Sequence, residues 1–435
     1  MTLSGDLAVV KEPPGPDLPA QRDPQVAATV SEMLSTIETH GLDAVQKYAE
    51  QLDGFVGRSF EIPASDLAAA GDELPADLRE ALDAGVERTQ RFAQMQREHL
   101  VDFEAEVLPG VVCGQRHVPV SNVGAYLPAG RFPLLASAFM TVGVARVAGV
   151  GNIVACTPPS RAGSAHPAVL YAAHASGADR VFALGGVQAL AAMAFGLLDG
   201  LPSDMVVGAG NAYVAEAKRQ LFGRVGIDVL AGPSEVAVIA DDSASATMVA
   251  ADLLGQAEHG PTSPACLITT SPRLAQEVPQ EIDRQLAGLS TRGVAEPAWR
   301  DHGSIYLAGD RETAAAAMDL LAPEHLEVLT EDLDWYLNRL RNYGSLFLGS
   351  WSTVAYADKG MSGTNHVLPT GRNARFTGGL SVAGFLKLLT YQRATRESTE
   401  AQARPVVTVS DFEELAAHRD SAQLRLDLIN ATVAS

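Results

Sequence analysis

Residues 181–198 read VFALGGVQALAAMAFGLL, a stretch with no charged side chain. Its length could just span a bilayer, so a membrane helix is one interpretation. The Gly185-Gly186 pair and the polar Gln188 favour another, in which a buried strand over 181–184 is followed by a tight turn and a core helix. We therefore predict a strand, turn and helix unit packed inside a globular domain.

Similar units flank this stretch between about 120 and 240. Short apolar runs alternate with helical stretches, which predicts a parallel sheet covered on both faces. We expect strands at 153–156, 181–184, 205–207, 227–230 and 236–240, and helices at about 137–147, 166–175, 188–198 and 212–221. This scaffold is typical of nucleotide-binding domains, although a fold alone does not give a function.

The remainder of the chain is organised differently. Residues 1–22 are rich in proline and aperiodic, which predicts an arm without packed elements. A helix is expected from Val26 to a C-cap at Gly41, and two more follow from Asp43 and over 77–96. Further expected features are a helix from about 244, an ordered functional loop over 358–380 and an amphipathic helix over 411–429.

The composition excludes some classes of binding partner. The 435 residues include 32 Lys and Arg against 52 Asp and Glu, a net charge of −20. Such a surface repels nucleic acid and anionic lipid, so we expect neither as a partner. The cysteines, at 113, 156 and 266, are too far apart for a disulfide framework or a CxxC metal site. No signal peptide is visible, and we expect a cytoplasmic protein.

Two pairs of residues could carry chemistry. Gln256 and His259 are three apart on an expected helix, so both side chains can reach one metal ion. A surface histidine with ordinary hydrogen bonds is the alternative. Glu324 and His325 combine the two commonest proton-transfer groups, although adjacent acids and bases also occur by chance.

Two glycine-rich segments are further candidates. Residues 208–211, GAGN, follow an expected strand and precede a helix, where free N–H groups favour a phosphate. They lack the third glycine of GxGxxG. Residues 362–379 place His366, Arg372 and Arg375 in one loop, for which plain solvation is the alternative.

Seven motifs in a fixed order resemble the histidinol dehydrogenase family. They extend over nearly the whole chain: GAYLPAG at 124–130, GGVQAL at 185–190, GAGNAYVAEAKR at 208–219, DVLAGPSEV at 228–236, DLLGQAEHGP at 252–261, APEHLEV at 322–328 and SGTNHVLPTG at 362–371. The resemblance implies a zinc-dependent, NAD-linked dehydrogenase. Such an enzyme oxidises a primary alcohol through an enzyme-held aldehyde to a carboxylate. A metal- or nucleotide-sensing module without turnover is the remote alternative.

The resemblance also assigns roles to residues. It implies one zinc ion per subunit, an acid/base pair, NAD contacts and substrate contacts. The implied zinc ligands, which also contact substrate, are Gln256, His259, Asp358 and His418; the acid/base pair is Glu324 and His325; the NAD contacts are Tyr126, Gln188 and Asn211; and the other substrate contacts are Ser234, His366 and Glu413. Two oxygen and two nitrogen ligands suit zinc. In such a site His325 would accept the alcohol proton, and Glu324 would activate the water that attacks the aldehyde.

The expected fold class is α/β, with two Rossmann-like domains that lack GxGxxG, a helical N-terminal region and an extended C-terminal tail. The main domain, with the zinc and catalytic residues, is predicted to comprise 23–125 and 236–378, and a nested NAD-binding domain to comprise 126–235. The resemblance also implies that the tail, 379–435, is exchanged in a homodimer, so that Glu413 and His418 complete the partner's site.

The substrate is less tightly specified. The stretches CTPP at 156–159, NYGSLFLG at 342–349 and YADKG at 356–360 are closer to a sulfopropanediol 3-dehydrogenase branch, which oxidises 2,3-dihydroxypropane-1-sulfonate to sulfolactate. L-Histidinol is the alternative substrate. A sulfonate requires fixed positive charge, for which guanidinium groups are suited. The candidates are Arg372, Arg375, Arg393 and Arg396, and the alternative is that they are solvated or paired with local acids.

Overall fold

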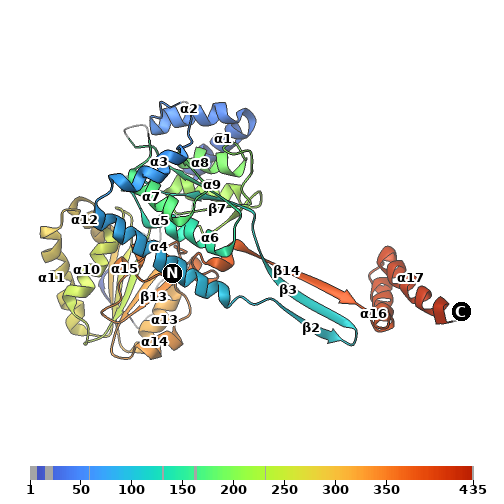
Figure 1. Ribbon diagram of the computed structural model, residues 1–435. Helices are drawn as coiled ribbons and strands as arrows, with labels where there is room; N and C mark the ends of the chain where they lie inside the picture. The colour runs from blue at the N-terminus through green and yellow to red at the C-terminus, as the bar shows by residue number, and fades with distance from the viewer. Residues whose placement is uncertain are drawn as a thin grey trace. The chain divides into compact units, whose positions relative to one another are not determined.

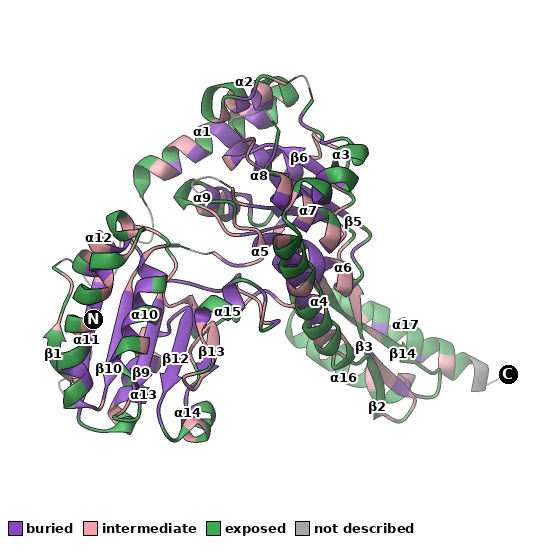
Figure 2. Cartoon of the chain, turned by 60° about the vertical axis from the view of Figure 1, so that its left-hand side comes forward, coloured by how far each residue is buried: buried purple, intermediate pink, exposed green. Residues whose placement is uncertain are grey.

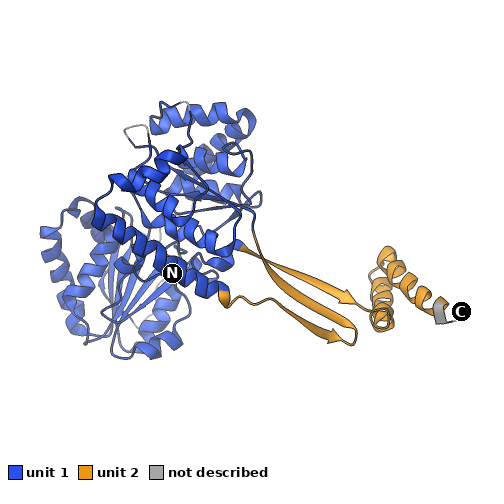
Figure 3. Ribbon diagram, in the orientation of Figure 1, with its two compact units in different colours: residues 1–97, 120–385 blue, residues 98–119, 386–435 orange. Residues whose placement is uncertain are grey.

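The computed structural model describes residues 7–14, 23–57, 59–129, 132–160, 164–230 and 232–433. The chain forms two compact units (Figure 3). Unit 1 comprises residues 1–97 and 120–385, and unit 2 comprises 98–119 and 386–435. Unit 1 contains two separate sheets (Figure 1), so the predicted α/β class with two Rossmann-like sheets is confirmed.

The first sheet of unit 1 has six strands in the order β1-β11-β10-β9-β12-β13. All neighbours are parallel except β1, which runs antiparallel to β11. The bounds are β1 (Leu7–Lys11), β9 (Val236–Ala240), β10 (Ala265–Thr269), β11 (Gly303–Ala308), β12 (His325–Leu329) and β13 (Ser345–Leu348).

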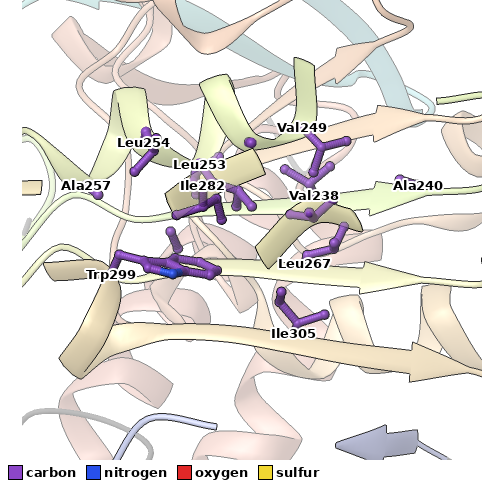
Figure 4. Packing of buried hydrophobic residues seen from close by; sticks show 14 of the residues in the cluster. Val238, Ala240, Val249, Leu253, Leu254, Ala257, Leu267, Ile282, Trp299 and Ile305 are labelled. Atoms are coloured by element: carbon purple, nitrogen blue, oxygen red, sulfur yellow. The ribbon is translucent and has the colours of Figure 1, made fainter. Parts of the chain in front are cut away.

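Helices cover both faces of this sheet because its strands are apolar on both sides. On one face Val238 and Leu267 pack against Leu253, Ile282 and neighbouring side chains of the first helix set (Figure 4). This set comprises α10 (Ala246–Ala257), α11 (Pro272–Gly288), α12 (Arg292–His302) and α15 (Val354–Asp358). The other face packs on α13 (Arg311–Leu321) and α14 (Leu333–Arg339). The sheet strands are the most deeply buried part of this layer (Figure 2).

The second sheet has five parallel strands in the order β6-β5-β4-β7-β8. The bounds are β4 (Asn122–Tyr126), β5 (Asn152–Thr157), β6 (Arg180–Ala183), β7 (Met205–Val207) and β8 (Gly226–Ile227). Its connecting helices are α5 (Ala136–Ala138), the π-helical turn η2 (Phe139–Gly143), α6 (Val144–Ala148), α7 (Pro167–Ser176), α8 (Gly186–Ala194) and α9 (Ala212–Leu221). The unit at 181–198 is thus β6, a glycine turn and α8, as predicted.

The helical N-terminal region is also confirmed. It contains α1 (Pro24–His40), α2 (Leu42–Asp53), α3 (Ala64–Ala69), η1 (Ala70–Glu73) and α4 (Ala76–Glu98). Gly41 caps α1 at φ 58°, as expected for a residue that stops a helix. Helices α1 and α2 pack on α8, so this part of the N-terminal region joins the layer of the five-stranded sheet.

Three sequence expectations need correction. Residues 7–11, expected in an unpacked arm, form β1, because the mostly apolar run LAVVK pairs with the free edge of β11. The rest of that arm, 1–6 and 15–22, lies outside the described residues. The strand expected at 227–230 ends at Ile227, and Asp228 turns back to bind the Gly208 backbone. The helix expected over 411–429 is interrupted at 413–415, where Glu414 has φ 59°.

Unit 2 is a three-stranded antiparallel sheet followed by a helix pair. The strand order is β14-β3-β2, and α16 packs against α17. The bounds are β2 (Phe103–Leu108), β3 (Val111–Pro119), β14 (Leu386–Ala394), α16 (Thr399–Phe412) and α17 (Ala416–Val433). Residues 379–385, which were expected in the tail, group with unit 1 instead. They include the short 3-10 helix η4 (Val382–Phe385), whereas η3 (Asn373–Arg375) lies in the long loop.

None of the helices that the structure describes is both long enough and apolar enough to cross a bilayer. The three cysteines are free thiols, and Cys156 and Cys266 are buried.

Candidate functional site

The predicted acid/base pair lies at the amino end of β12. Glu324 immediately precedes the strand and His325 is its first residue, next to the start of the parallel neighbour β9. Glu324 Oε2 accepts hydrogen bonds from the Ser234 hydroxyl at 2.7 Å and from the Glu235 N–H at 2.9 Å. The structure therefore brings Ser234, Glu324 and His325 together.

The hydrogen bonds of His325 define which ring nitrogen can act as a base. Its Nδ1 lies 3.1 Å from the carbonyl oxygen of Glu235, and because a carbonyl only accepts, Nδ1 carries the proton. Nε2 has no hydrogen-bond partner among the described residues. The side chain is 2% exposed, and burial lowers its pKa. His325 is thus a neutral imidazole whose Nε2 lone pair is available.

Two carboxyl groups lie near this imidazole, the buried Glu324 and the half-buried Glu235. Burial raises the pKa of Glu324 to about 8, although the bonds from Glu235 and Ser234 oppose the shift. Burial also raises the pKa of Glu235 to about 8, and the nearby Glu324 adds to that effect. A carboxyl group with a pKa close to neutral pH can both accept and donate a proton, as a general acid/base must.

Two histidines of unit 1 converge on Asp358. The helix α10 returns from the far end of β9, with Gln256 in its last turn; His259, expected on the same helix, lies in the turn that follows the helix end at Ala257. The short helix α15 returns in the same way from β13 and ends at Asp358. His259 Nε2 lies 3.3 Å from Asp358 Oδ2, and His325 Nε2 lies 3.7 Å from Asp358 Oδ1.

Asp358 is the charged centre of this group. Burial alone would raise its pKa, but the hydrogen bond from His259 and the nearby His366 and His325 hold it well below the usual range. The bond to Asp358 in turn raises the pKa of His259. His366 Nδ1 lies 4.0 Å from Asp358 Oδ1, and burial lowers the pKa of His366.

Gln256 shows that this group fits a metal ion. Its side chain is 2% exposed, and within the described part of the chain neither its amide oxygen nor its amide nitrogen has a partner. A buried amide without partners is costly, so a ligand for its oxygen is expected. An amide oxygen, an imidazole nitrogen and a carboxylate oxygen form a donor set that zinc accepts. The described chain contains no group of three or more His, Cys, Asp or Glu side chains able to hold a metal by themselves.

The predicted NAD contacts lie at the carboxyl ends of the second sheet. The Tyr126 hydroxyl, at the end of β4, accepts from the Gly186 N–H at 3.2 Å. Gln188, in the first turn of α8, is 1% exposed, and its Oε1 lacks a partner among the described residues. Asn211 caps α9 by accepting from the N–H groups of Tyr213 and Val214.

The turn at Gly208 packs tightly against the end of β4. Gly208 has φ 118°, and a Cβ added there would lie 2.1 Å from the Tyr126 carbonyl oxygen. The turn is held by a buried ion pair, since Asp228 accepts from the Gly208 N–H and Lys218 donates to the Gly208 carbonyl. Glycine is therefore required at this position, directly after β7.

The last two predicted site residues belong to unit 2. Glu413 follows the end of α16 and His418 lies in the first turn of α17, and both are exposed. Their place in the site stays a prediction.

Sequence reasoning did not single out several residues that hold the site residues in place. Asp53 accepts from the Gln188 amide at 2.9 Å and from the Gly185 N–H at 3.1 Å. Glu235 accepts hydrogen bonds from the Glu324 and Gly371 N–H groups. It therefore links the acid/base pair to the loop over 358–380. The available signal for Glu235 was a carboxylate directly before an apolar strand, in the quoted motif DVLAGPSEV.

Comparisons with known proteins show which family this chain resembles. Residues 17–426 match the family model described as histidinol dehydrogenase. A histidinol dehydrogenase homolog of Shouchella clausii is 46% identical over 92% of this chain and 94% of its own length. A sulfopropanediol 3-dehydrogenase of Ruegeria pomeroyi is 46% identical over 92% of each chain. The crystal structure of histidinol dehydrogenase from Elizabethkingia anophelis covers 95% of this chain and 94% of its own, with 33% identity and a TM-score of 0.89.

Proposed function

We propose a reaction for this chain, which belongs to the histidinol dehydrogenase family. The reaction is the zinc-dependent, NAD-linked oxidation of a primary alcohol, through an aldehyde kept in the site, to a carboxylate. The observation that carries the proposal is the convergence of His325 Nε2, which has no hydrogen-bond partner among the described residues, and of His259 Nε2 on the carboxylate of Asp358.

The metal would be held by Gln256, His259 and Asp358, with His418 as the fourth predicted ligand. Zinc, when bound, polarises the oxygen of the substrate as a Lewis acid. His325 Nε2 accepts the proton of the alcohol, because its Nδ1–H stays bonded to the Glu235 carbonyl. Glu324 then removes a proton from the water that adds to the aldehyde. Ser234 and the Glu235 N–H orient the Glu324 carboxyl group for this step.

NAD, when bound, accepts a hydride in each of the two oxidation steps. Gln188 Oε1 supports a place for the dinucleotide, because it is a buried acceptor without a donor among the described residues. Tyr126 stays a neutral phenol, since burial raises its pKa to about 12. Its hydroxyl and the tight turn at Gly208 line the same carboxyl edge of the sheet.

For the substrate we propose 2,3-dihydroxypropane-1-sulfonate, and L-histidinol is the alternative. The similarity to the Ruegeria pomeroyi sulfopropanediol 3-dehydrogenase supports the first, and relatives named histidinol dehydrogenase support the second. The four candidate arginines bind elsewhere: Arg372 to the Leu320 carbonyl, Arg375 to the Arg372 carbonyl, Arg393 to Glu104 and Arg396 to the Leu428 carbonyl.

A different cation is better placed for a sulfonate. Lys359 directly follows Asp358, its side chain is exposed, and its positive charge opposes protonation of His259 and His366. A fixed cation beside the metal ligands is what an anionic substrate requires.

The deciding experiment is an assay of the purified, zinc-loaded protein with NAD and each alcohol, followed by NADH absorbance. Two NADH per alcohol consumed, with the sulfonate preferred, would support the proposal. Preference for L-histidinol would support the alternative substrate. Binding of zinc and NAD without turnover of either alcohol would contradict the proposed activity.

We also propose that the site is shared in a homodimer, because two predicted site residues, Glu413 and His418, belong to unit 2. If the tail of one subunit completes the partner's site, both lesions of a dimer mixed from His418→Ala and His325→Ala fall in one site. The other site is then intact, so mixing the two inactive variants should restore activity. An absence of recovery, with subunit exchange verified independently by mass, would reject the shared site.

A further inference from the structure

Glu327 is a charged residue at an unexpected place in the six-stranded sheet. It lies in the middle of β12, two residues after His325 and on the same face, and it is 0% exposed. That face otherwise packs apolar side chains, among them Leu253, Leu329 and Val354. A carboxyl group in such surroundings requires specific partners.

Its partners come from two helices that return to the site. Glu327 Oε1 accepts from the Val354 N–H, at the start of α15, at 3.0 Å. The neighbouring Thr353 hydroxyl donates to Asp252 Oδ1, on α10, at 2.9 Å. The carboxyl groups of Glu327 and Asp252 lie close enough to interact, and no N–H or hydroxyl donor of the described residues reaches Glu327 Oε2.

Two interacting carboxyl groups in a buried place are more stable when one of them holds a proton. Burial and the nearby Asp252 raise the pKa of Glu327 to about 8, so Glu327 is the protonated member at neutral pH. Asp252 can then accept from both Glu327 and Thr353. The result is one connected set of interactions among β12, α10 and α15.

Each of these three elements carries a site residue a short distance away. His325 is two residues from Glu327 on β12, Gln256 is one helical turn after Asp252 on α10, and Asp358 ends the single-turn helix that Thr353 caps. Because α15 is only five residues long, its direction depends on how its first turn is held.

We propose that Asp252, Glu327 and Thr353 are positioning residues, which hold Asp358 and Gln256 in the arrangement that binds the zinc ion. The inference rests on the proposed metal site. It differs from a purely structural role, because a buried ionisable pair that serves stability alone can be replaced by apolar residues without loss. Residues that orient metal ligands typically change metal affinity by about 10- to 100-fold when they are removed.

The test compares zinc dissociation constants, measured by competition with a chromophoric chelator on metal-stripped, refilled protein. Glu327→Met keeps the volume and removes the hydrogen bonds, and we expect zinc affinity to fall about 10- to 100-fold. Glu327→Gln can still donate to Asp252 and accept from Val354, so we expect it to remain within about threefold of the parent protein. Glu216, a buried carboxylate of α9, supplies the matched control: Glu216→Met should not change zinc affinity.

A second variant keeps the inference testable if Glu327→Met does not fold. Thr353→Val removes one hydroxyl on a half-buried side chain, and we expect a smaller loss of zinc affinity with a folded circular dichroism spectrum. Zinc affinity equal to the parent in both folded Glu327→Met and Thr353→Val would overturn the inference alone. A parent protein that binds no zinc would overturn the proposed function and this inference with it.

Discussion

The two sheets of unit 1 place their candidate functional residues at opposite edges. In the five-stranded sheet, Tyr126 ends β4 and Gly208 follows β7, so the residues lie at the carboxyl ends of the strands. In the six-stranded sheet, Glu235 precedes β9 and Glu324 precedes β12, so the residues lie at the amino ends.

This difference follows the polarity of the connecting helices. At the carboxyl edge of the five-stranded sheet α8 and α9 begin, and helix N-termini carry partial positive charge that favours an anionic dinucleotide. At the amino edge of the six-stranded sheet α10 ends, and helix C-termini favour a cation. The two ends of the strands in a parallel sheet therefore differ in electrostatic potential. The side chains at each end decide whether an anion or a cation binds there.

The largest effect is expected when Asp358, the carboxylate at the amino edge of the six-stranded sheet, is replaced. Asp358→Asn should lower both zinc content and turnover by more than about 100-fold, because a neutral amide replaces the charge that holds His259. NAD binding at the other sheet should be unchanged. Metal analysis together with NADH production would measure the first effect, and dinucleotide-induced fluorescence change the second. Stoichiometric zinc in the variant would contradict the assignment.

Replacing Glu324 and replacing His325 should affect the two steps of the reaction differently. Glu324→Gln is expected to slow aldehyde oxidation by about 100-fold and alcohol oxidation less, because only the aldehyde step needs an activated water. His325→Ala should slow both steps. Single-turnover rates with the alcohol and with the aldehyde would distinguish them. Near-normal rates for both variants with both compounds would make the assignment wrong.

The proposed dinucleotide site, at the carboxyl edge of the five-stranded sheet, can be tested separately at the Gly208 turn. Gly208→Ala forces a Cβ against the Tyr126 carbonyl at φ 118°, so we expect about a tenfold rise in the KM for NAD and a cost of about 1–3 kcal/mol in folding stability. Zinc affinity should stay constant. Gly223→Ala is the matched control, because Gly223 has φ 99° with nothing within 4 Å of the added atom. An equal KM for NAD in the two variants would show that the turn does not serve the dinucleotide.

A further prediction concerns pH and the buried Glu327. Its pKa is raised to about 8 in the folded chain, so between about pH 5 and 8 the folded state binds more protons than the unfolded state. Stability should therefore fall as pH rises through this range, by up to about 1.4 kcal/mol per pH unit from this one group. Glu327→Gln should give a flatter curve in denaturant titrations. An unchanged slope would show that Glu327 is ionised in the fold.

Local pattern was sufficient for much of the architecture. The apolar run at 236–240 became β9 with the predicted bounds, and Gly41 ends α1 as expected. The pairing of β1 was missed because a five-residue edge strand depends on a partner almost 300 residues away. Edge pairing of this kind leaves no periodic signal in a single sequence.

The site shows the same division between local and long-range information. Gln256 and His259 could be predicted as a pair from their spacing, and the structure places His259 beside Asp358, although His259 follows the end of α10. The contacts of Asp53 with Gln188 and of Glu327 with Asp252 could not, because each joins elements far apart in the chain. Buried partners of this kind are recognisable only once the tertiary packing is known.

Strand β1 has one more consequence, which concerns solubility. It replaces β11 as the outermost strand on its side of the six-stranded sheet, so the edge is a five-residue strand that ends in Lys11. Long apolar edge strands recruit strands from other molecules and promote aggregation, whereas short edge strands that carry a lysine do so less. The Lys11 ammonium group also fixes this strand, since it binds the Gly303 carbonyl at the start of β11. Strand β1 therefore limits self-association, and a protein shortened past residue 11 should precipitate more readily than the full chain.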